Sequence, residues 1–141
     1  MNPLIVEREY NAPIAKVWSA ITDHKEMKAW YFELDEFRAE PGFVFHFYGE
    51  NEGRSFKHIC TVLEADAPHK LSYSWTYEGY EGYSVVSFEL TELPGNRTAV
   101  RLTHTGLESF PQDNADFART NFEAGWNAII GKSLPQYVEN Q

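Results

Sequence analysis

The residues most able to do chemistry in this sequence are its five histidines and its single cysteine. They are His24, His46, His58, His69, His104 and Cys60. A neutral imidazole can accept a proton or orient a polar ligand group, and a thiolate can act as a nucleophile. His58 and Cys60 stand two residues apart, so a thiolate–imidazole pair is the first chemistry to consider.

The geometry of a strand argues against this pair. Side chains at i and i+2 of a strand lie parallel and about 7 Å apart, which is too far for a direct hydrogen bond. Cys60 is better explained as a small buried hydrophobe. His58 alternates with Phe56 and Cys60, and His104 alternates with Leu102, so both imidazoles are predicted to face the apolar interior. A buried imidazole is more often structural than catalytic, and no catalytic residue is assigned.

No other reactive arrangement stands out. The sequence contains no HxH or HExxH spacing, no paired cysteines and no glycine-rich phosphate loop. Asp113 and Asp116 fall where one of them could cap a helix, and His24, His46 and His69 are expected to face water. The sequence therefore predicts no metal site and no cofactor.

The composition limits the kinds of partner. The formal net charge is −9, from 21 acidic and 12 basic side chains, so nucleic acid and anionic membrane surfaces are disfavoured. No stretch approaches the ~20 apolar residues of a membrane span. A single cysteine fits a reducing compartment, and residues 1–10 lack the apolar stretch of a secretory signal, so we expect a cytoplasmic protein.

The N-terminal part predicts one strand and two short helices. Leu4 to Tyr10 has the pattern of a strand, and Asn11-Ala12-Pro13 ends it. A first helix follows, with its apolar side chains on one face at Ile14, Val17, Trp18 and Ile21. Asp23 followed by Glu26 resembles a capping box, and it opens a second helix through Trp30.

From Phe32 to Gly106 the hydrophobic period changes to two, which is typical of strands. The predicted strands are Phe32–Glu40, Phe43–Gly49, Phe56–Glu64, Leu71–Tyr77, Tyr83–Leu93 and Thr98–Thr105. Between Leu71 and Tyr77, the alternation places Tyr73 and Trp75 on a covered face and Ser72 and Ser74 on a wet face. Short turns join these strands, so the sheet is predicted to be an antiparallel meander.

A long helix is predicted from Phe117 to about Val138. Its apolar stripe contains Phe122, Trp126, Ile129 and Ile130. Pro135 removes the hydrogen bond to the carbonyl of Gly131, so we expect a bend between these two residues. Residues 1–141 are thus predicted to form one α+β domain, with about six or seven antiparallel strands curved around the C-terminal helix and two short helices after the first strand.

Three stretches resemble the motifs of a known family. Asn11-Ala12-Pro13-Ile14-Ala15-Lys16-Val17-Trp18, with Ala20-Ile21-Thr22 and Trp30, is similar to its "APxxxVWxAIT…W" opening. Residues 67–75, APHKLSYSW, resemble "PPxxLxYSW". Residues 102–107, LTHTGL, with Gly125-Trp126 and LPQYV at 134–138, resemble "LTHxG…GWxxxLxxLxxYL". The chain is therefore similar to the helix-grip (START-like, Bet v 1-like) domains, and within them to the activator of Hsp90 ATPase homolog 1-like family.

This resemblance implies an apolar ligand site between the sheet and the C-terminal helix. The candidate ligand-binding residues are Trp30, Phe45, Phe47, His58, Cys60, Tyr73, Trp75, Phe88, His104, Phe122, Trp126 and Ile130. The implied function is binding of a hydrophobic, amphipathic or lipid-like small molecule by a monomer or weak homodimer, without catalysis. Two alternatives stay open: an enzyme of the cyclase, dehydratase or hydrolase type, and a co-chaperone in a stress response with a chaperone partner. Large aromatic side chains could also fill much of the hollow.

Overall fold

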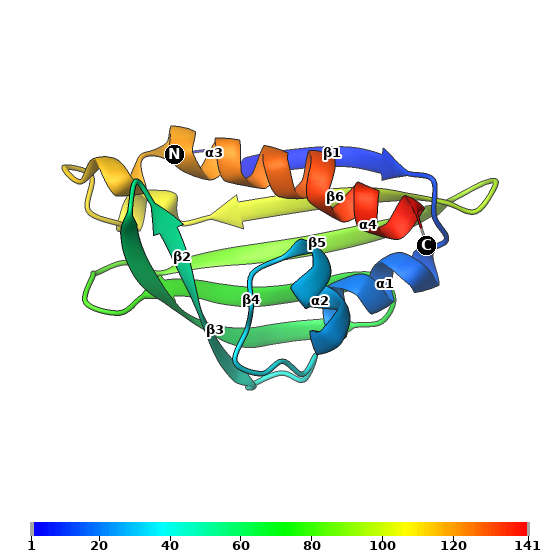
Figure 1. The fold of residues 1–141 in the computed structure, drawn as a ribbon, viewed down its shortest axis with the longest axis horizontal. Helices are drawn as coiled ribbons and strands as arrows, with labels where there is room; N and C mark the ends of the chain where they lie inside the picture. Colours follow the sequence, from blue (N-terminus) through cyan, green and yellow to red (C-terminus); the bar gives the residue numbers. More distant parts are fainter. Residues whose placement is uncertain (1, 141) are drawn as a thin grey trace.

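A six-stranded antiparallel sheet forms the frame of the structure, a computed structural model that describes residues 2–140 (Figure 1). The strands lie in the order β1-β6-β5-β4-β3-β2, so β1 and β2 are the two edges. Their bounds are β1 (Leu4–Tyr10), β2 (Val44–Asn51), β3 (Arg54–Asp66), β4 (Lys70–Tyr77), β5 (Ser84–Leu93) and β6 (Arg97–Thr105). Every consecutive pair of strands from β2 to β6 forms a hairpin, and β1 pairs antiparallel with β6 at the edge of the sheet.

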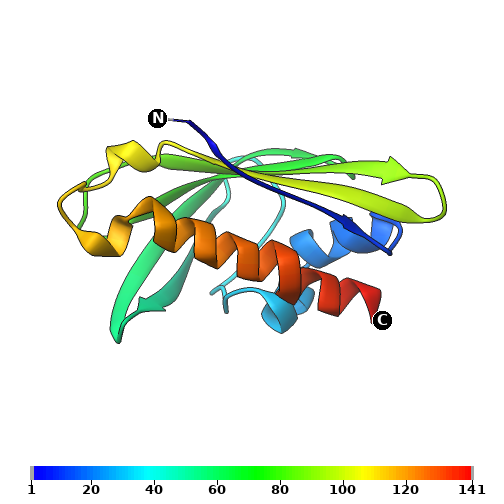
Figure 2. The same cartoon turned by 90° about the horizontal axis from the view of Figure 1, so that it is seen from above.

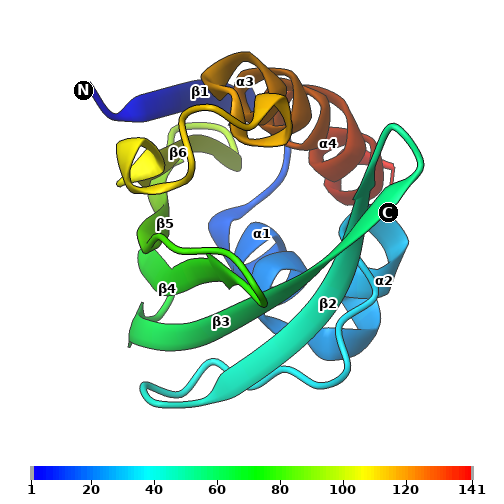
Figure 3. The ribbon, with the colours of Figure 1, turned by 90° about the vertical axis from the view of Figure 1, so that its left-hand side faces the viewer.

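The helices gather on one face of this sheet. They are α1 (Ile14–Thr22), α2 (His24–Trp30), the 3₁₀ turns η1 (Leu107–Ser109) and η2 (Ala115–Phe117), then α3 (Arg119–Ala128), the π turn η3 (Ile129–Ser133) and α4 (Leu134–Glu139). The C-terminal helix crosses the sheet (Figure 2), and from the end the sheet is seen to curve around the helical side (Figure 3). Among residues 2–140, none of the helices is both long and apolar enough to cross a membrane. The predicted α+β helix-grip architecture is confirmed, with six strands.

The first two helices follow the sequence pattern closely. In α1 the buried residues include Ile14, Val17 and Ile21, as the 3.6-residue period requires. The Asp23 side chain accepts hydrogen bonds from the backbone N–H groups of Lys25 and Glu26 and so caps α2. The ends of α1 and α2 are therefore determined locally.

The predicted strand Phe32–Glu40 is wrong, because residues 31–43 have no regular secondary structure. Leu34 and Phe37 are buried three residues apart, so the segment does not have the single buried face that an alternating strand would give it. Polar contacts hold this segment beside β2 instead: the backbone N–H of Asp35 donates to the carbonyl of His46 over 3.0 Å. The Asp35 carboxylate in turn accepts from the His46 backbone N–H and contacts its Nδ1, each over 2.9 Å.

The outer face of β4 is also drier than predicted. Ser72 and Ser74 lie on it but are buried, with 5% and 4% exposure. Ser72 Oγ lies 3.0 Å from Ser87 Oγ on β5, and Ser74 Oγ accepts from the backbone N–H of Thr61 on β3. The hydroxyls of these two buried serines are thus both paired with groups on the neighbouring strands.

The C-terminal helix begins at Arg119, with Ala118 as its N-cap, so neither Asp113 nor Asp116 caps it. Where a bend between Gly131 and Pro135 was predicted, the structure has a π turn that begins at Ile129, and the helix runs on without a sharp break (Figure 2). The N–H of Leu134 donates to the carbonyl of Ile129, five residues back. In a π turn each N–H bonds to the carbonyl five residues back, so Pro135, which has no N–H, leaves the carbonyl of Ile130 without a backbone donor. The α-helical spacing assumed from the sequence had predicted Gly131 as the residue with the unpaired carbonyl.

Tyr10 supplies the missing donor. Its side chain reaches from β1 and its hydroxyl donates to the Ile130 carbonyl. Tyr10 is 1% exposed, so this carbonyl would otherwise be buried and unpaired. The proline, the π turn and the tyrosine thus form one structural unit that docks the helix on β1.

Candidate functional site

A cavity of about 160 Å³ lies where α3 faces β2, β3 and β4. The residues that line it are Phe32, Gly49, Glu50, Asn51, His58, Trp75, Tyr77, Asp116, Asn121, Phe122, Gly125, Trp126 and Ile129. Most of the interior between the helix and the sheet is filled with large side chains, including Tyr73, Phe88 and Leu102, each at most 1% exposed. The cavity beside α3 therefore lies at one end of the interface.

His58 forms an aromatic wall of this cavity. Its ring stacks on Phe47 with centroids 4.3 Å apart and meets Trp75 edge to face at 4.8 Å. Gly49 makes room for it, since a Cβ there would lie only 2.8 Å from Cε1 of His58. Burial lowers the pKa of His58 to about 4, although the carbonyls of Phe56 and Phe47 act in the opposite direction. The imidazole is therefore neutral at physiological pH.

His104 belongs to a buried hydrogen-bond chain behind the cavity. The indole N–H of Trp126 donates to His104 Nδ1 over 3.0 Å, so the proton of the neutral ring sits on Nε2. Nε2 lies 2.8 Å from Ser84 Oγ and donates to it, and Ser84 donates to the carbonyl of Trp75 over 2.7 Å. His104 is 0% exposed, and burial lowers its pKa to about 3. Both ring nitrogens are used, which makes this a structural histidine.

Cys60 and the buried tyrosines are held in their protonated forms. Cys60 is 0% exposed, and burial raises the pKa of its thiol well above the ordinary value. Burial likewise raises the pKa of Tyr73 and Tyr77. The hydroxyls of Tyr31 and Tyr73 pair over 2.7 Å. The thiolate that nucleophilic chemistry needs is therefore suppressed at Cys60.

A group of polar contacts among Arg54, Asp116 and Asn51, called the latch, lies at one side of the opening, or mouth, of the cavity. Arg54, next to the β2–β3 turn, makes a bidentate contact with Asp116, with Nε–Oδ2 2.8 Å and Nη2–Oδ1 2.5 Å. Asn51 donates to the same carboxylate over 2.8 Å. The hydrogen bonds from Arg54 and Asn51 hold the pKa of Asp116 below its usual range. The latch ties the hairpin to the segment that leads into α3.

Four of the predicted ligand-binding residues line this cavity: His58, Trp75, Phe122 and Trp126. The other eight lie elsewhere in the buried core, namely Trp30, Phe45, Phe47, Cys60, Tyr73, Phe88, His104 and Ile130. Their involvement in ligand binding stays a prediction. The other histidines are outside the cavity: His46 is half-buried, His69 is exposed and Nε2 of His24 lies 2.8 Å from the Leu34 carbonyl.

Several lining residues were missed by the sequence analysis. Tyr77 could have been included, since it continues the alternation of Tyr73 and Trp75. Gly125 carries a weaker signal, because glycine inside a helix is unfavourable by about 1 kcal/mol relative to alanine and needs a reason. Asn51 and Asp116 gave no local signal, since only the fold brings them together. Within residues 2–140, no three His, Cys, Asp or Glu side chains are grouped as metal ligands.

The comparisons with known proteins agree with this architecture. The profile of the family described as activator of Hsp90 ATPase homolog 1-like protein matches residues 11–139. The chain belongs to this family, and its fold is that of the helix-grip domains. No curated protein matches the chain significantly.

Solved structures from several bacteria are similar to this chain. Protein MLL2253 from Mesorhizobium loti is 26% identical, with a TM-score of 0.81 and coverage of 99% of this chain and 98% of that one. Protein BH1534 from Bacillus halodurans is 25% identical, with a TM-score of 0.76 and coverage of 98% and 97%. CalU16 from Micromonospora echinospora is 25% identical, with a TM-score of 0.71 and coverage of 96% and 75%. Their descriptions name no ligand or reaction.

Proposed function

We propose that this protein binds a small apolar or amphipathic molecule in the cavity beside α3, without changing it chemically. The observation that carries the proposal is a cavity of about 160 Å³ with aromatic walls, set between helix and sheet and open past a polar rim. Concave sites lined by aromatic side chains with a few polar groups are the usual form of small-molecule sites. Membership of the family supports the same class of function.

Binding is proposed in preference to catalysis because the protonation states and hydrogen bonds of the buried cysteine and histidines do not suit a nucleophile or a general base. Burial raises the pKa of Cys60, and His104 already uses both ring nitrogens. His58 has a pKa of about 4, whereas a general base works best with a pKa near the operating pH. These features favour a receptor or carrier over a cyclase, dehydratase or hydrolase.

The cavity can be blocked by a single substitution on α3. Gly125 lines it, and a Cβ placed there meets no atom within 4 Å. Because the Cβ has free space, Gly125→Leu should extend its side chain over the cavity and block it, and by removing a helical glycine it should leave the fold intact. Gly125→Ala is the matched control, since it makes the same improvement in helix propensity but adds only one methyl group.

The test uses toluene as a neutral probe, followed by protein NMR and thermal unfolding. We expect toluene to shift resonances around Trp75 and Trp126 and to stabilise the wild type and Gly125→Ala, by about 2.7 kcal/mol at a hundred times Kd. Gly125→Leu should fold and show neither effect. Equal responses in Gly125→Leu and Gly125→Ala would show that the probe binds elsewhere and would contradict the proposal.

A further inference from the structure

The cavity beside α3 restricts the size of its ligand, and the inference that follows rests on the proposed function. An engineered protein cavity of ~150 Å³ with apolar walls holds one benzene molecule. The volume of about 160 Å³ found here is similar. There is room for one aromatic ring, with a short head group at the mouth, but not for a fused polycycle or a long acyl chain.

The polar atoms left over at the mouth are mainly hydrogen-bond acceptors. Asn51 uses one of its two amide N–H groups on the Asp116 carboxylate, and the Asn121 amide nitrogen donates to the carbonyls of Ala115 over 2.9 Å and Asp116 over 3.4 Å. These partners can only accept, so the assignment of amide N and O is settled for both residues. Each Oδ1 then has no donor among the described residues. Both side chains are at least partly exposed, so a ligand head group that donates hydrogen bonds would replace water at these oxygens.

The aromatic walls present ring carbons and not N–H groups. The indole N–H of Trp126 is used on His104, and that of Trp75 on the Tyr77 hydroxyl over 2.8 Å. The faces of such rings are electronegative and attract cations. His58 is neutral because burial lowers its pKa, so it adds no positive charge. Tyr77 keeps one hydroxyl proton that it can donate to a ligand.

The charges near the mouth also favour a cation. Glu50 and Asp116 both line the cavity, and Glu50 has no ion-pair partner among residues 2–140. Arg54 is shared between Asp116 at 2.5 Å and Glu52 at 3.5 Å. The three carboxylates outnumber this one guanidinium, so a ligand carboxylate entering here would meet net negative charge.

We propose that the cavity takes a compound with a single aromatic ring and a hydrogen-bond-donating head group, and that it prefers an ammonium to a carboxylate. The ring packs against Trp75, Trp126 and Phe122. The head group lies at the mouth, where it donates to the amide oxygens of Asn51 and Asn121.

Calorimetric titration with two matched probes tests this class. 2-Phenylethylamine and 3-phenylpropionate carry the same ring on similar short chains, with opposite charges at neutral pH. At low salt we expect the amine to bind at least about tenfold more tightly, and the difference to shrink in 0.5 M NaCl because salt screens exposed charges. Equal affinities, or tighter binding of the carboxylate, would overturn the proposal.

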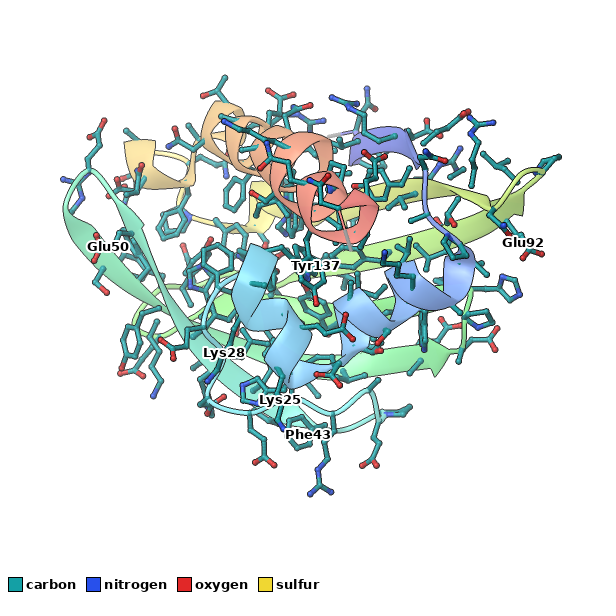
Figure 4. All side chains as sticks on the ribbon, turned by 45° about the vertical axis from the view of Figure 1, so that its right-hand side comes forward. Lys25, Lys28, Phe43, Glu50, Glu92 and Tyr137 are labelled. Carbon is teal, nitrogen blue, oxygen red and sulfur yellow. The ribbon has the colours of Figure 1, made fainter. Side chains whose placement is uncertain are left out.

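Two variants separate a local effect from that of the total charge. Glu50 lies at the mouth, and Glu92 lies at the opposite end of the molecule (Figure 4). Glu50→Gln should reduce the preference for the amine about two- to fivefold, as expected for one exposed charge near the site. Glu92→Gln removes the same charge and should leave the preference unchanged. Equal reductions in the two variants would assign the preference to net charge and would contradict a site-specific origin.

Gly125→Leu separates an error in the proposed ligand class from an error in the proposed binding function. If toluene and both charged probes bind the wild type and lose binding in Gly125→Leu, but without preference for the amine, the proposed function holds and the ligand class is wrong. If toluene and both charged probes fail to bind the wild type, the proposed function fails together with the ligand class.

Discussion

Trp126 connects the buried hydrogen-bond chain to the cavity. Its indole lies 5.5 Å from Trp75 between ring centroids, lines the cavity and donates to His104. The helical stripe predicted that Trp126 faces the sheet, and its 3% exposure confirms this. The hydrogen bond could not be predicted, because it depends on how far α3 is displaced along β6. A periodicity shows which face is buried but not which atoms meet across the interface.

Replacing Trp126 with phenylalanine tests the hydrogen bond separately from packing. Trp126→Phe leaves Nδ1 of His104 buried without a donor, which should cost about 1–3 kcal/mol of unfolding free energy beyond the lost volume. Trp18 is half-buried and has no indole hydrogen bond among the described residues, so Trp18→Phe is the matched control. Urea titrations measure both variants. Similar losses would show that the indole N–H contributes little, while Trp126→Ala should still cost about 3–5 kcal/mol.

At the scale of the elements, the sequence predicted the structure correctly where the interacting residues are close together in the chain. The hairpins β2 to β6 and the cap of α2 follow from turns and from Asp23, which act over a few residues. The strand predicted at Phe32–Glu40 is wrong because apolar and acidic residues alternate there as they would in a strand. In the structure Leu34 and Phe37 are buried in the core, but the segment is not part of a sheet. The choice between strand and loop was made by tertiary packing.

A double-mutant cycle tests the contact between the C-terminal helix and β1. Tyr10→Phe should cost about 1–3 kcal/mol, because the Ile130 carbonyl loses its donor in a buried site. Pro135→Ala alone should be neutral or stabilising, since it restores a backbone N–H. With Ala at 135 that N–H can reach the Ile130 carbonyl, so Tyr10→Phe should cost less in this background. We expect a coupling of about 0.5–2 kcal/mol in urea unfolding, and strictly additive effects would contradict the shared carbonyl.

At the scale of the whole molecule, the sequence predicted a ligand site spread along the entire interface of helix and sheet. The structure fills most of that interface with large side chains and has a cavity at the end near α3 and the β2–β3 hairpin. The position of such a space depends on the sum of side-chain volumes between two curved elements, which no local pattern contains. The latch of Arg54 and Asp116 at its mouth joins residues that are 62 positions apart.

Two buried neutral histidines should make the stability of the whole molecule depend on pH. Folding lowers the pKa of His58 from 6.5 to about 4 and that of His104 from 6.5 to about 3. Below pH 6.5 the unfolded chain therefore binds protons that the folded protein does not, and the unfolding free energy falls as the pH is lowered from 6.5 towards 4. Each histidine contributes a slope of up to about 1.4 kcal/mol per pH unit in this window.

Urea unfolding between pH 4.5 and 7.5 measures this slope. His104→Gln should be less stable at neutral pH, but its slope should be smaller by the contribution of one histidine. Ser84→Ala breaks the same hydrogen-bond chain without removing a titrating group, so it should lose stability and keep the full slope. Asp116 acts in a separate range, since its lowered pKa gives stability that is lost only as the pH falls below the usual range of a carboxyl group. A slope in His104→Gln equal to that of the wild type would mean that His104 is not held neutral by burial.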